Sequence, residues 1–318
     1  MKLSILIPVY NSEKTIERLV GELVAELSPC YPLEVVLVND CSKDQSEAAG
    51  IRLFEKHRDI VRFYSLSKNV GEHNAVMAGL HKATGDYVVI MDDDLQNPVR
   101  EVIQLVEAAA QNDFDVVYSY YERKRHSLFR NFGSWVNDQA ANFLLNKPKD
   151  LYLSSFKVVN RFLVDEIIKN RSPFPYIDGL ILQVTDRIGK VRVEHLERPE
   201  GESGYTLRKL ISLWLNMFTS FSVLPLRIST LLGFFFSLLS LVLGGYVIQE
   251  KLSHPNLPLG YASLIVAFSF LAGVQLMVVG MVGEYVGRIF LSLNQKPQFT
   301  VKKAYEFLRP EEISQVTK

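Results

Sequence analysis

The chain has few cysteines and no excess of either charge. Its two cysteines among 318 residues, Cys30 and Cys41, are too few for a disulfide-stapled domain, and a reducing compartment is expected. Lysine plus arginine and aspartate plus glutamate each number 35, so net charge argues neither for nor against a polyanionic partner. No nucleic-acid partner is expected. A hydrophobic share of 48% excludes a disordered or collagen-like chain.

Charged residues are also scarce in the last third of the chain. From residue 210 onward about 13 of about 109 residues are charged, against about 57 of the first 209. The first part has the composition of a soluble protein, whereas the second is too poor in charge for one. This division excludes a simple soluble enzyme and predicts a membrane-integrated region.

Two long runs in the second part contain no charged residue, Ile228–Gln249 and Pro255–Gly283. At ~1.5 Å per residue, either run makes a helix that crosses a hydrocarbon core of ~30 Å. Pro255 and Pro258 interrupt the link between them. The pattern predicts a hairpin of two transmembrane helices over about residues 228–249 and 257–283, with a buried core helix as the alternative for either run.

Basic residues flank this hairpin on its outer sides. The link has Lys251 opposed by Glu250, whereas the flanks contain Arg208, Lys209, Arg227, Arg288, Lys296, Lys302 and Lys303. Positive residues collect on the cytoplasmic side of membrane helices. We therefore expect a multi-pass protein of the inner (plasma) membrane with both termini in the cytoplasm. No signal peptide is expected, because the first ten residues have a short apolar strand pattern.

A shorter apolar pattern precedes the first span. Over Thr206–Phe221, apolar residues recur at helical spacing with polar residues off that face, which predicts an amphipathic helix in the headgroup layer. A helix packed on the soluble part is the alternative. The expected domains are a catalytic part at 1–205, the interfacial helix at 206–224, two spans at 225–291 and a cytoplasmic tail at 292–318. Four glycines leave room for helix contact within the hairpin or in the expected homo-oligomer: Gly273, Gly280, Gly283 and Gly287.

The first part alternates short apolar runs with helical periodicity. The runs are Leu3–Val9, Leu33–Asn39, Val61–Leu66 and Tyr87–Met91, and the helices are expected near 16–27, 45–58, 72–83 and 98–112. This order predicts an α/β fold with a doubly wound, mostly parallel sheet.

Polar residues follow every one of these strands. They are Tyr10 and Asn11, then Asp40, then Ser67–Asn69, then Asp92–Asp94. Ligands of parallel sheets bind beyond the carboxyl ends of the strands. The sequence therefore predicts one site at that edge.

The segment after the fourth strand is strongly acidic, running from Asp92 to Pro98 as Asp-Asp-Asp-Leu-Gln-Asn-Pro. If it is extended, Asp92, Asp94 and Gln96 point the same way. Neighbouring carboxylates repel unless a cation lies between them. Oxygen ligands favour Mg²⁺ or Mn²⁺, which completes its shell with water and substrate phosphate. A nucleotide diphosphate is then a natural ligand, and an acidic turn that caps the next helix is the alternative.

The motifs together resemble family 2 glycosyltransferases of the GT-A fold. The resemblance rests on four segments and the acidic one: Ile7–Asn11, Val38–Asp44, Lys68–Gly71, Gly85–Tyr87 and Asp92–Pro98. The acidic segment resembles that of dolichyl-phosphate mannose synthase and of bacterial polyprenyl-phosphate glycosyltransferases. The two-helix tail is similar to that of bacterial O-antigen-modifying glucosyltransferases, which load undecaprenyl phosphate. Cys41 departs from the family, which often has glycine there.

This resemblance implies roles on the donor side. Pro8, Tyr10 and Asp40 would hold the nucleotide base, with the Asp40 carboxylate accepting a ring N–H, and Asn11 and Asn69 belong to the same substrate site. The metal ligands would be Asp92, Asp94 and Gln96. Asp93 would face away or contact the sugar.

The resemblance also implies which residues bind the phosphate acceptor. Arg123, Arg125 and Arg130 form a basic segment suited to phosphate, with a solvated surface as the alternative. In the loop His195–Tyr205, Arg198, Ser203 and Tyr205 match residues that approach the phosphates. Gly204 replaces a common lysine, and Lys209 would supply some of that charge. Asp150 and Ser155–Lys157 are similar to a segment near the acceptor face.

The implied enzyme moves a hexose, foremost glucose from UDP-glucose, to undecaprenyl phosphate by one inverting displacement. The implied catalytic residues are Asp92, Asp94, Arg123, Arg130 and Arg198. A lipid phosphate is already anionic and needs no general base, so Asp178 is expected to bind sugar or to have a structural role. A processive polysaccharide synthase and a catalytically silent membrane scaffold are the alternatives.

Overall fold

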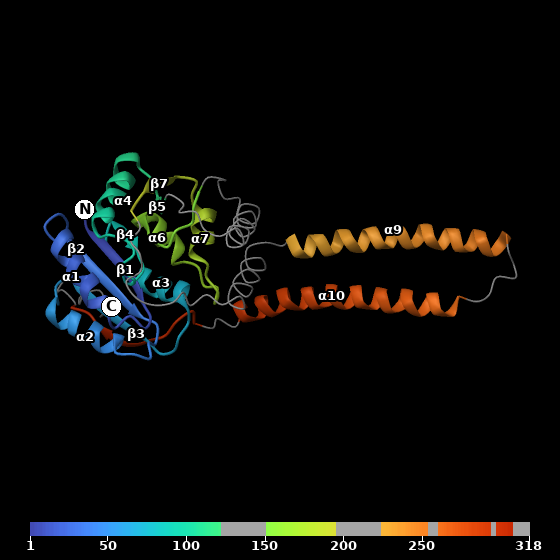
Figure 1. Cartoon of the computed structure of the whole chain (residues 1–318), viewed down its shortest axis with the longest axis horizontal. Coiled ribbons are helices and arrows are strands. Elements are labelled where there is room, and N and C mark those ends of the chain that lie inside the picture. The colour runs from blue at the N-terminus through green and yellow to red at the C-terminus, as the bar shows by residue number, and fades with distance from the viewer. Residues whose placement is uncertain (122–150, 195–223, 254–259, 294–296, 308–318) are drawn as a thin grey trace. The chain divides into compact units, whose positions relative to one another are not determined.

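The computed structural model describes residues 1–121, 151–194, 224–253, 260–293 and 297–307. These residues form two units (Figure 1). One unit contains the first two ranges together with residues 297–307, and the other contains the two long helices of 224–253 and 260–293.

The described part of the first unit is built on a sheet of eight strands, in the order β7-β5-β6-β4-β1-β2-β3-β8. The strands are β1 (Leu3–Val9), β2 (Leu33–Asn39), β3 (Val61–Leu66), β4 (Tyr87–Ile90), β5 (Val116–Tyr120), β6 (Lys157–Asn160), β7 (Ile188–Arg192) and β8 (Val301–Tyr305). The helices are α1 (Ile16–Leu27), α2 (Ser46–Lys56), α3 (Glu72–Leu80), α4 (Arg100–Asn112), α6 (Arg161–Ile167) and α7 (Ile177–Val184).

The sheet is covered on both faces, as predicted. Successive side chains of a strand point to opposite faces. Ile5 of β1 belongs to a core with residues of α1, α2 and α4, whereas the next residue, Leu6, belongs to a core with residues of α3, α6 and α7. Every residue of β2 is buried, which explains why its sequence is nearly continuously apolar.

The sheet is mixed, but it is mostly parallel as predicted, because only β6 and β8 run against the other strands of the described sheet, and β5 pairs in parallel with β7. β1 pairs in parallel with β2 and β4, and β2 pairs in parallel with β3, as the alternation of strand and helix predicts. β6, however, is antiparallel to β4 and β5, and β8 is antiparallel to β3. The strand–helix alternation extends only over the first four strands, so it could not predict these later reversed pairings.

The tail expected at residues 292–318 contains β8. The ring of Tyr305 lies 5.9 Å from that of Phe54 and 6.0 Å from that of Phe63, so this strand packs on the core of the first unit. Ser67, just after β3, donates its backbone N–H to the carbonyl oxygen of Thr300 at 2.9 Å. The chain therefore returns to the first unit after the long helices.

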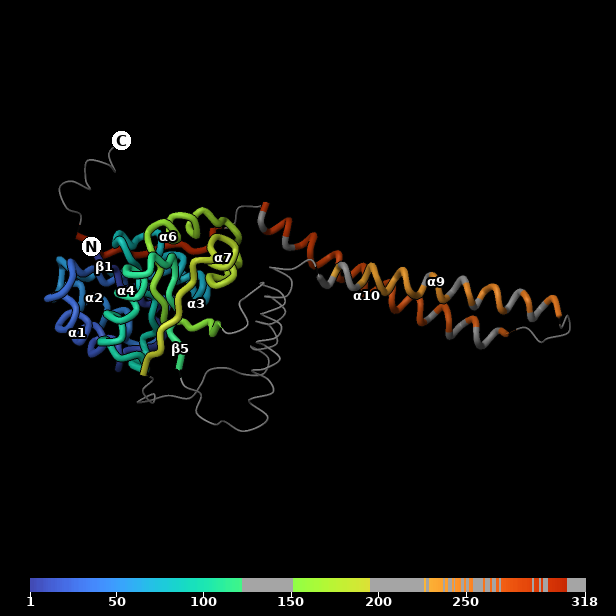
Figure 2. Tube along the Cα trace, turned by 90° about the horizontal axis from the view of Figure 1, so that it is seen from above, coloured from blue at the N-terminus to red at the C-terminus, as the bar shows by residue number. Residues whose placement is uncertain are grey.

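The second unit consists, in its described part, of α9 (Leu224–Ser253) and α10 (Tyr261–Leu293). They run side by side in opposite directions in both views (Figures 1 and 2), and the rings of Phe236 and Phe270 meet at 5.5 Å. Within the described residues, the stretch Phe270–Leu291 of α10 is long and apolar enough to cross a membrane, with a mean hydropathy of 1.5. The amphipathic helix expected at 206–221 lies outside the described residues.

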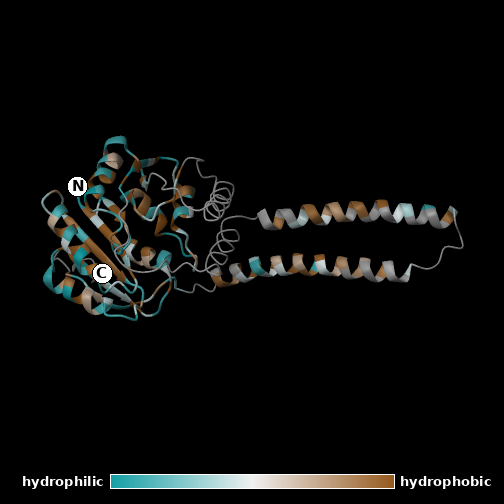
Figure 3. Cartoon of the chain, viewed as in Figure 1, coloured by the Kyte–Doolittle hydropathy of each residue, from teal (hydrophilic) through white to brown (hydrophobic). Residues whose placement is uncertain are grey.

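Hydrophobic residues recur along the described parts of both long helices (Figure 3), and many of their side chains are exposed. Phe234 of α9 is 74% exposed and Met277 of α10 is likewise 74% exposed. Large exposed apolar surfaces mark contact with a partner or with lipid.

Candidate active site

The carboxyl ends of the four parallel strands meet at one edge of the sheet. Val9 at the end of β1 is in register with Asn39 at the end of β2, and Leu6 is in register with Ile90 at the end of β4. The loops that follow these strands therefore start beside one another. The contacts described below show that the predicted donor-side segments do come together there.

The acidic segment after β4 is tied to the loop after β1 through Asp93. Its Oδ2 atom accepts the backbone N–H of Tyr10 at 3.1 Å and the hydroxyl of Ser12. Burial, opposed by these two hydrogen bonds and reinforced by the nearby carboxylates of Asp92 and Asp94, raises the pKa of Asp93 to about 6. Asp93 thus holds the β1 loop, and a contact with the sugar stays a prediction.

The other acidic residues are half-buried at the same edge. Asp92 accepts the hydroxyl of Ser155 at its Oδ2 atom over 2.5 Å. Asp94 accepts the backbone N–H of Gln96 at its Oδ1 atom over 3.1 Å, and Leu95 between them has a φ of 60°. The expectation of an extended segment is therefore wrong over residues 94–96, because the left-handed residue makes a tight turn there.

The donor set fits a hard divalent cation with few protein ligands. In the ranges that the structure describes, no group of three or more histidine, cysteine, aspartate or glutamate side chains gathers as a metal cluster. Mg²⁺ is usually bound by one or two carboxylates and takes its remaining ligands from water and substrate phosphates. Asp92 and Asp94 can provide that number, and the part of Gln96 stays a prediction.

Asp40 organises the loop after β3. It is 4% exposed, and its two carboxylate oxygens accept the backbone N–H groups of Val70 at 2.7 Å and Gly71 at 2.9 Å. Asn69 donates its side-chain amide to the Asp40 carbonyl oxygen at 3.2 Å. Burial raises the pKa of Asp40, and the two N–H groups oppose that effect. Gly71 has a φ of 87°, which favours glycine.

The loops after β1 and β2 are also joined to each other. Asn11 donates its backbone N–H to the Ser42 hydroxyl at 3.0 Å, and its side-chain Oδ1 accepts the N–H of Lys43 at 2.9 Å. Asn11 and Cys41 both have a φ of 55°. The left-handed backbone at Cys41 accounts for the glycine that the family often has at this position. The Tyr10 side chain is exposed beside this junction.

A second cluster lies on the other side of the acidic segment, and the sequence did not predict it. Lys157 of β6 forms a buried ion pair with Asp178 of α7, and Tyr118 of β5 donates its hydroxyl to Asp178 at 2.9 Å. The Lys157 Nζ atom also lies 5.1 Å from the centre of the Tyr118 ring. The Asp178 carboxylate is thus engaged by Lys157 and Tyr118. Two signals pointed here, the likeness of Ser155–Lys157 to a family segment and the expectation that Asp178 binds sugar or has a structural role.

Glu72 and His73 at the start of α3 adjoin both clusters. The Glu72 side chain reaches solvent, but much of its surroundings is protein. The resulting desolvation is the main cause that raises its pKa to about 7, and the negative charge of Asp92 is the second. The His73 ring makes an edge contact with Tyr176 at 5.1 Å. Sequence reasoning missed Glu72, because only the fold places the start of α3 near the end of β4.

Most acceptor-side predictions cannot be placed. The residues concerned lie outside the described ranges: Arg123, Arg125, Arg130, Asp150, Arg198, Ser203, Tyr205 and Lys209. Their roles stay predictions.

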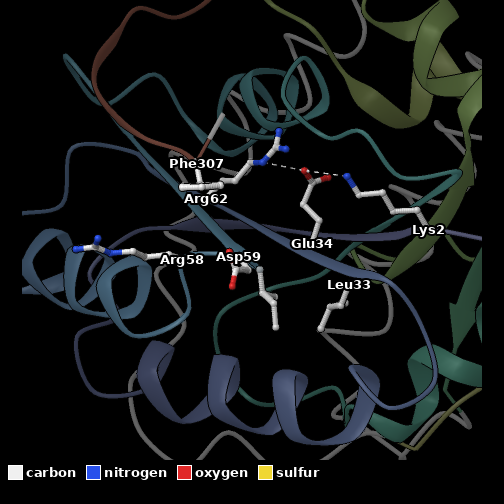
Figure 4. Close-up of a pocket in the computed structure, with 8 residues that line it drawn as sticks. Lys2, Leu33, Glu34, Arg58, Asp59, Arg62 and Phe307 are labelled. Carbon is white, nitrogen blue, oxygen red and sulfur yellow. Dashed lines mark ion pairs between the residues drawn. The ribbon is translucent and has the colours of Figure 1, made fainter. Parts of the chain in front are cut away.

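A separate pocket lies at the opposite ends of the strands, where β2 and β3 begin (Figure 4). Inside it the buried Glu34 pairs with Arg62 at 3.0 Å and with Lys2 at 3.7 Å. Burial opposes the charged form of Glu34, but hydrogen bonds from Ser4 and Thr84 and the two cations outweigh burial and lower its pKa. Because its charge is satisfied within the protein, Glu34 has a structural role.

Comparison with known proteins agrees with this geometry. Residues 4–168 match the family described as Glycosyl transferase family 2, and residues 224–289 match the family described as GtrB C-terminal hairpin. The bactoprenol glucosyl transferase of the SfII prophage of Shigella flexneri is 32% identical over 96% of this chain and 99% of its own length. The undecaprenyl-phosphate 4-deoxy-4-formamido-L-arabinose transferase of Sodalis glossinidius is 32% identical over 95% of this chain and 93% of its own length.

Solved structures share the fold. Glucosyl-3-phosphoglycerate synthase of Mycobacterium tuberculosis, crystallised with Mn²⁺ and UDP-glucose, has a TM-score of 0.51 and 18% identity, covering 69% of this chain and 77% of its own. At this identity the likeness shows the fold alone, a mixed α/β sheet of the GT-A type. Because the family match spans β1 to α6 and the relatives align over nearly their whole length, the chain belongs to glycosyl transferase family 2 and is a glycosyltransferase.

Proposed function

We propose that this enzyme transfers a hexose, foremost glucose from UDP-glucose, to undecaprenyl phosphate at the cytoplasmic face of the membrane. The observation that supports this most is a continuous series of hydrogen bonds at one sheet edge, which joins the acidic segment after β4 to the loop after β1, that loop to the loop after β2, and Asp40 to the loop after β3. The same chain continues into a region that matches the GtrB C-terminal hairpin. Relatives named for bactoprenol and undecaprenyl phosphate support the lipid acceptor.

On the donor side, the nucleotide base would bind near Pro8, Tyr10 and Asp40. Tyr10 has an exposed ring that can stack on a base. Asp92 and Asp94, with Gln96, would hold Mg²⁺ or Mn²⁺, which neutralises charge on the leaving nucleoside diphosphate. Asn11 and Asn69 shape the same site through their contacts with neighbouring loops.

On the acceptor side, arginines would hold the lipid phosphate as the nucleophile. Arginine suits this task because its planar fork donates two parallel hydrogen bonds to phosphate oxygens. The proposed set is Arg123, Arg125, Arg130, Arg198, Ser203, Tyr205 and Lys209. A phosphate that is already anionic needs no general base, which agrees with the engagement of Asp178 in an ion pair.

The membrane part would position this acceptor. We propose that α9 and α10 are two transmembrane helices, with residues 206–224 in the headgroup layer and both termini in the cytoplasm. The exposed apolar side chains of both helices and the apolar stretch Phe270–Leu291 support spanning. The glycines of α10, with open space around Gly273 and Gly280, suit helix packing in a homo-oligomer.

The direct test is a transfer assay with the purified full-length protein, undecaprenyl phosphate, Mn²⁺ and a panel of nucleotide sugars, read by mass spectrometry. The expected product is a lipid-linked hexose, made best from UDP-glucose. From an α-linked donor the product should be β-linked by NMR, and an α-linked product would refute a single displacement. A long sugar polymer would favour a processive synthase instead. Failure to bind Mn²⁺ or any uridine nucleotide by calorimetry would favour a silent scaffold.

A further inference from the structure

The start of β6 lies directly beside the acidic segment. In the antiparallel ladder between β4 and β6, Ile90 is opposite Lys157. Continuing that register by two residues beyond the ladder places Ser155 opposite Asp92. The Ser155 hydroxyl donates to the Asp92 Oδ2 atom at 2.5 Å, within the range of a charge-assisted O–H···O⁻ hydrogen bond.

The backbone around Ser155 is fixed by its neighbours. Lys157, two residues after Ser155, is the first residue of β6 and is anchored by its ion pair with Asp178. Phe156 between them is fully buried in the core that contains residues of α1, α2 and α4. Ser154, the residue before, accepts the Ser119 hydroxyl at 2.8 Å and the backbone N–H of Phe156 at 3.2 Å. The residues on either side of Ser155 are therefore anchored, and they fix the backbone that carries its hydroxyl.

We propose that Ser155 is a positioning residue that orients the Asp92 carboxylate for a divalent cation. This inference rests on the metal dependence in the proposed function. The hydrogen bond from Ser155 holds one oxygen of the half-buried Asp92 carboxylate and so restricts the rotation of that carboxylate before the cation arrives. Partners that hydrogen-bond metal ligands commonly change metal affinity by about 10- to 100-fold when they are lost.

The test measures Mn²⁺ binding directly, without turnover. Mn²⁺ is titrated into the full-length protein in detergent with saturating UDP. The concentration of free Mn²⁺ is measured at each step by electron paramagnetic resonance. Ser155→Ala should weaken Mn²⁺ binding by about 10-fold. Ser155→Thr keeps the hydroxyl and should stay within about twofold of the wild type. Cysteine is close to serine in size but is a weak hydrogen-bond donor. Ser155→Cys should therefore weaken Mn²⁺ binding about as much as Ser155→Ala does.

Ser154→Ala is the matched control. It removes a hydroxyl one residue away that contacts Ser119 and Phe156 instead of Asp92. Because this change loosens the backbone but keeps the hydrogen bond to Asp92, it should lower the unfolding temperature and weaken Mn²⁺ binding by less than Ser155→Ala does. In the transfer assay, Ser155→Ala should raise the half-saturating Mn²⁺ concentration, while the KM for UDP-glucose at saturating Mn²⁺ stays close to wild type.

The outcomes separate this inference from the proposed function. Wild-type affinity for Mn²⁺ in both Ser155→Ala and Ser155→Cys would overturn the role of Ser155 alone. Equal weakening by Ser154→Ala would also overturn it, because the effect would then report general loosening of β6. If the wild-type protein itself binds no Mn²⁺ and transfers sugar without a divalent cation, the metal assignment of the proposed function fails.

Discussion

Ser12 donates its hydroxyl to the Oδ2 atom of Asp93, which also accepts the backbone N–H of Tyr10. This contact joins the loop after β1 to the acidic segment after β4. The same segment is held from its other side, where Ser155 donates to Asp92. The proposed base-binding loop and the proposed metal-binding segment are thus linked through protein contacts that exist before any ligand binds.

Replacing Cys41 with glycine should stabilise the protein. Cys41 has a φ of 55°, a left-handed conformation that costs an L-residue about 1–2 kcal/mol. Glycine removes that cost, but it increases the conformational entropy of the unfolded chain, which lowers the free energy of unfolding by about 0.4–1 kcal/mol. We expect a net gain of about 0.5 kcal/mol in the free energy of unfolding, measured by denaturation of the full-length protein in detergent.

Cys30→Gly is the control for this substitution. Cys30 is exposed and is absent from the residues with positive φ in the described part of the chain, so glycine brings only the entropic cost there. It should be neutral or destabilising. Equal effects of the two substitutions would show that backbone strain at Cys41 is not the cause.

Glu34→Gln should lower stability in a pH-dependent way. Glu34 is 3% exposed and pairs with Arg62 and Lys2, so loss of its charge should cost about 3 kcal/mol at neutral pH. Its folded pKa lies below its ordinary value, so its contribution is present above the unfolded pKa and is lost as the pH falls through the folded one. The stability difference between wild type and variant should therefore shrink below about pH 4. A difference that does not change with pH would contradict the ion-pair assignment.

A double-mutant cycle should show that Lys157 and Asp178 act as one unit. Removing either partner leaves a buried charge unpaired, which should cost about 3–5 kcal/mol. Lys157→Met with Asp178→Leu removes both charges and should cost much less than the sum of the single changes. Additive costs in denaturant unfolding would show that the two side chains do not depend on each other.

Tyr305→Ala should destabilise the first unit although it lies in β8, which follows the two long helices in the sequence. Its ring packs between Phe54 and Phe63, and removing a half-buried aromatic should cost about 2 kcal/mol. Phe307→Ala, two residues away and 52% exposed, should change stability by less than about 0.5 kcal/mol. Similar small effects of both would show that β8 does not stabilise this unit in solution.

The part of the fold that could be predicted is the part set by local pattern. β1, β2 and β3 have the predicted bounds, because buried parallel strands are nearly continuous apolar runs. β6 and β8 could not be predicted, since a short strand's partner and direction depend on tertiary pairing. The contact of Ser155 with Asp92 depends on that reversed pairing and was missed with it.

The candidate site was predictable to a similar degree. The position of Asp40 and Asp92–Asp94 after parallel strands places them at one edge by topology alone. Which way each carboxylate turns depends on side-chain contacts, so the hydrogen bonds of Asp93 to the β1 loop were not foreseen. A turn in the acidic segment, now seen at Leu95, was foreseen only as the alternative to a metal site. Glu72 had no sequence signal, because its neighbourhood is created by folding.

The most direct test of the central claim, that a divalent cation held at the end of β4 activates a sugar nucleotide, is transfer by the Asp94→Ala variant. The purified full-length variant is compared with wild type for formation of lipid-linked hexose from UDP-glucose, Mn²⁺ and undecaprenyl phosphate, with unfolding temperature as the check on folding. We predict a wild-type unfolding temperature and a loss of transfer to background. A correctly folded variant that turns over at close to the wild-type rate would contradict the account.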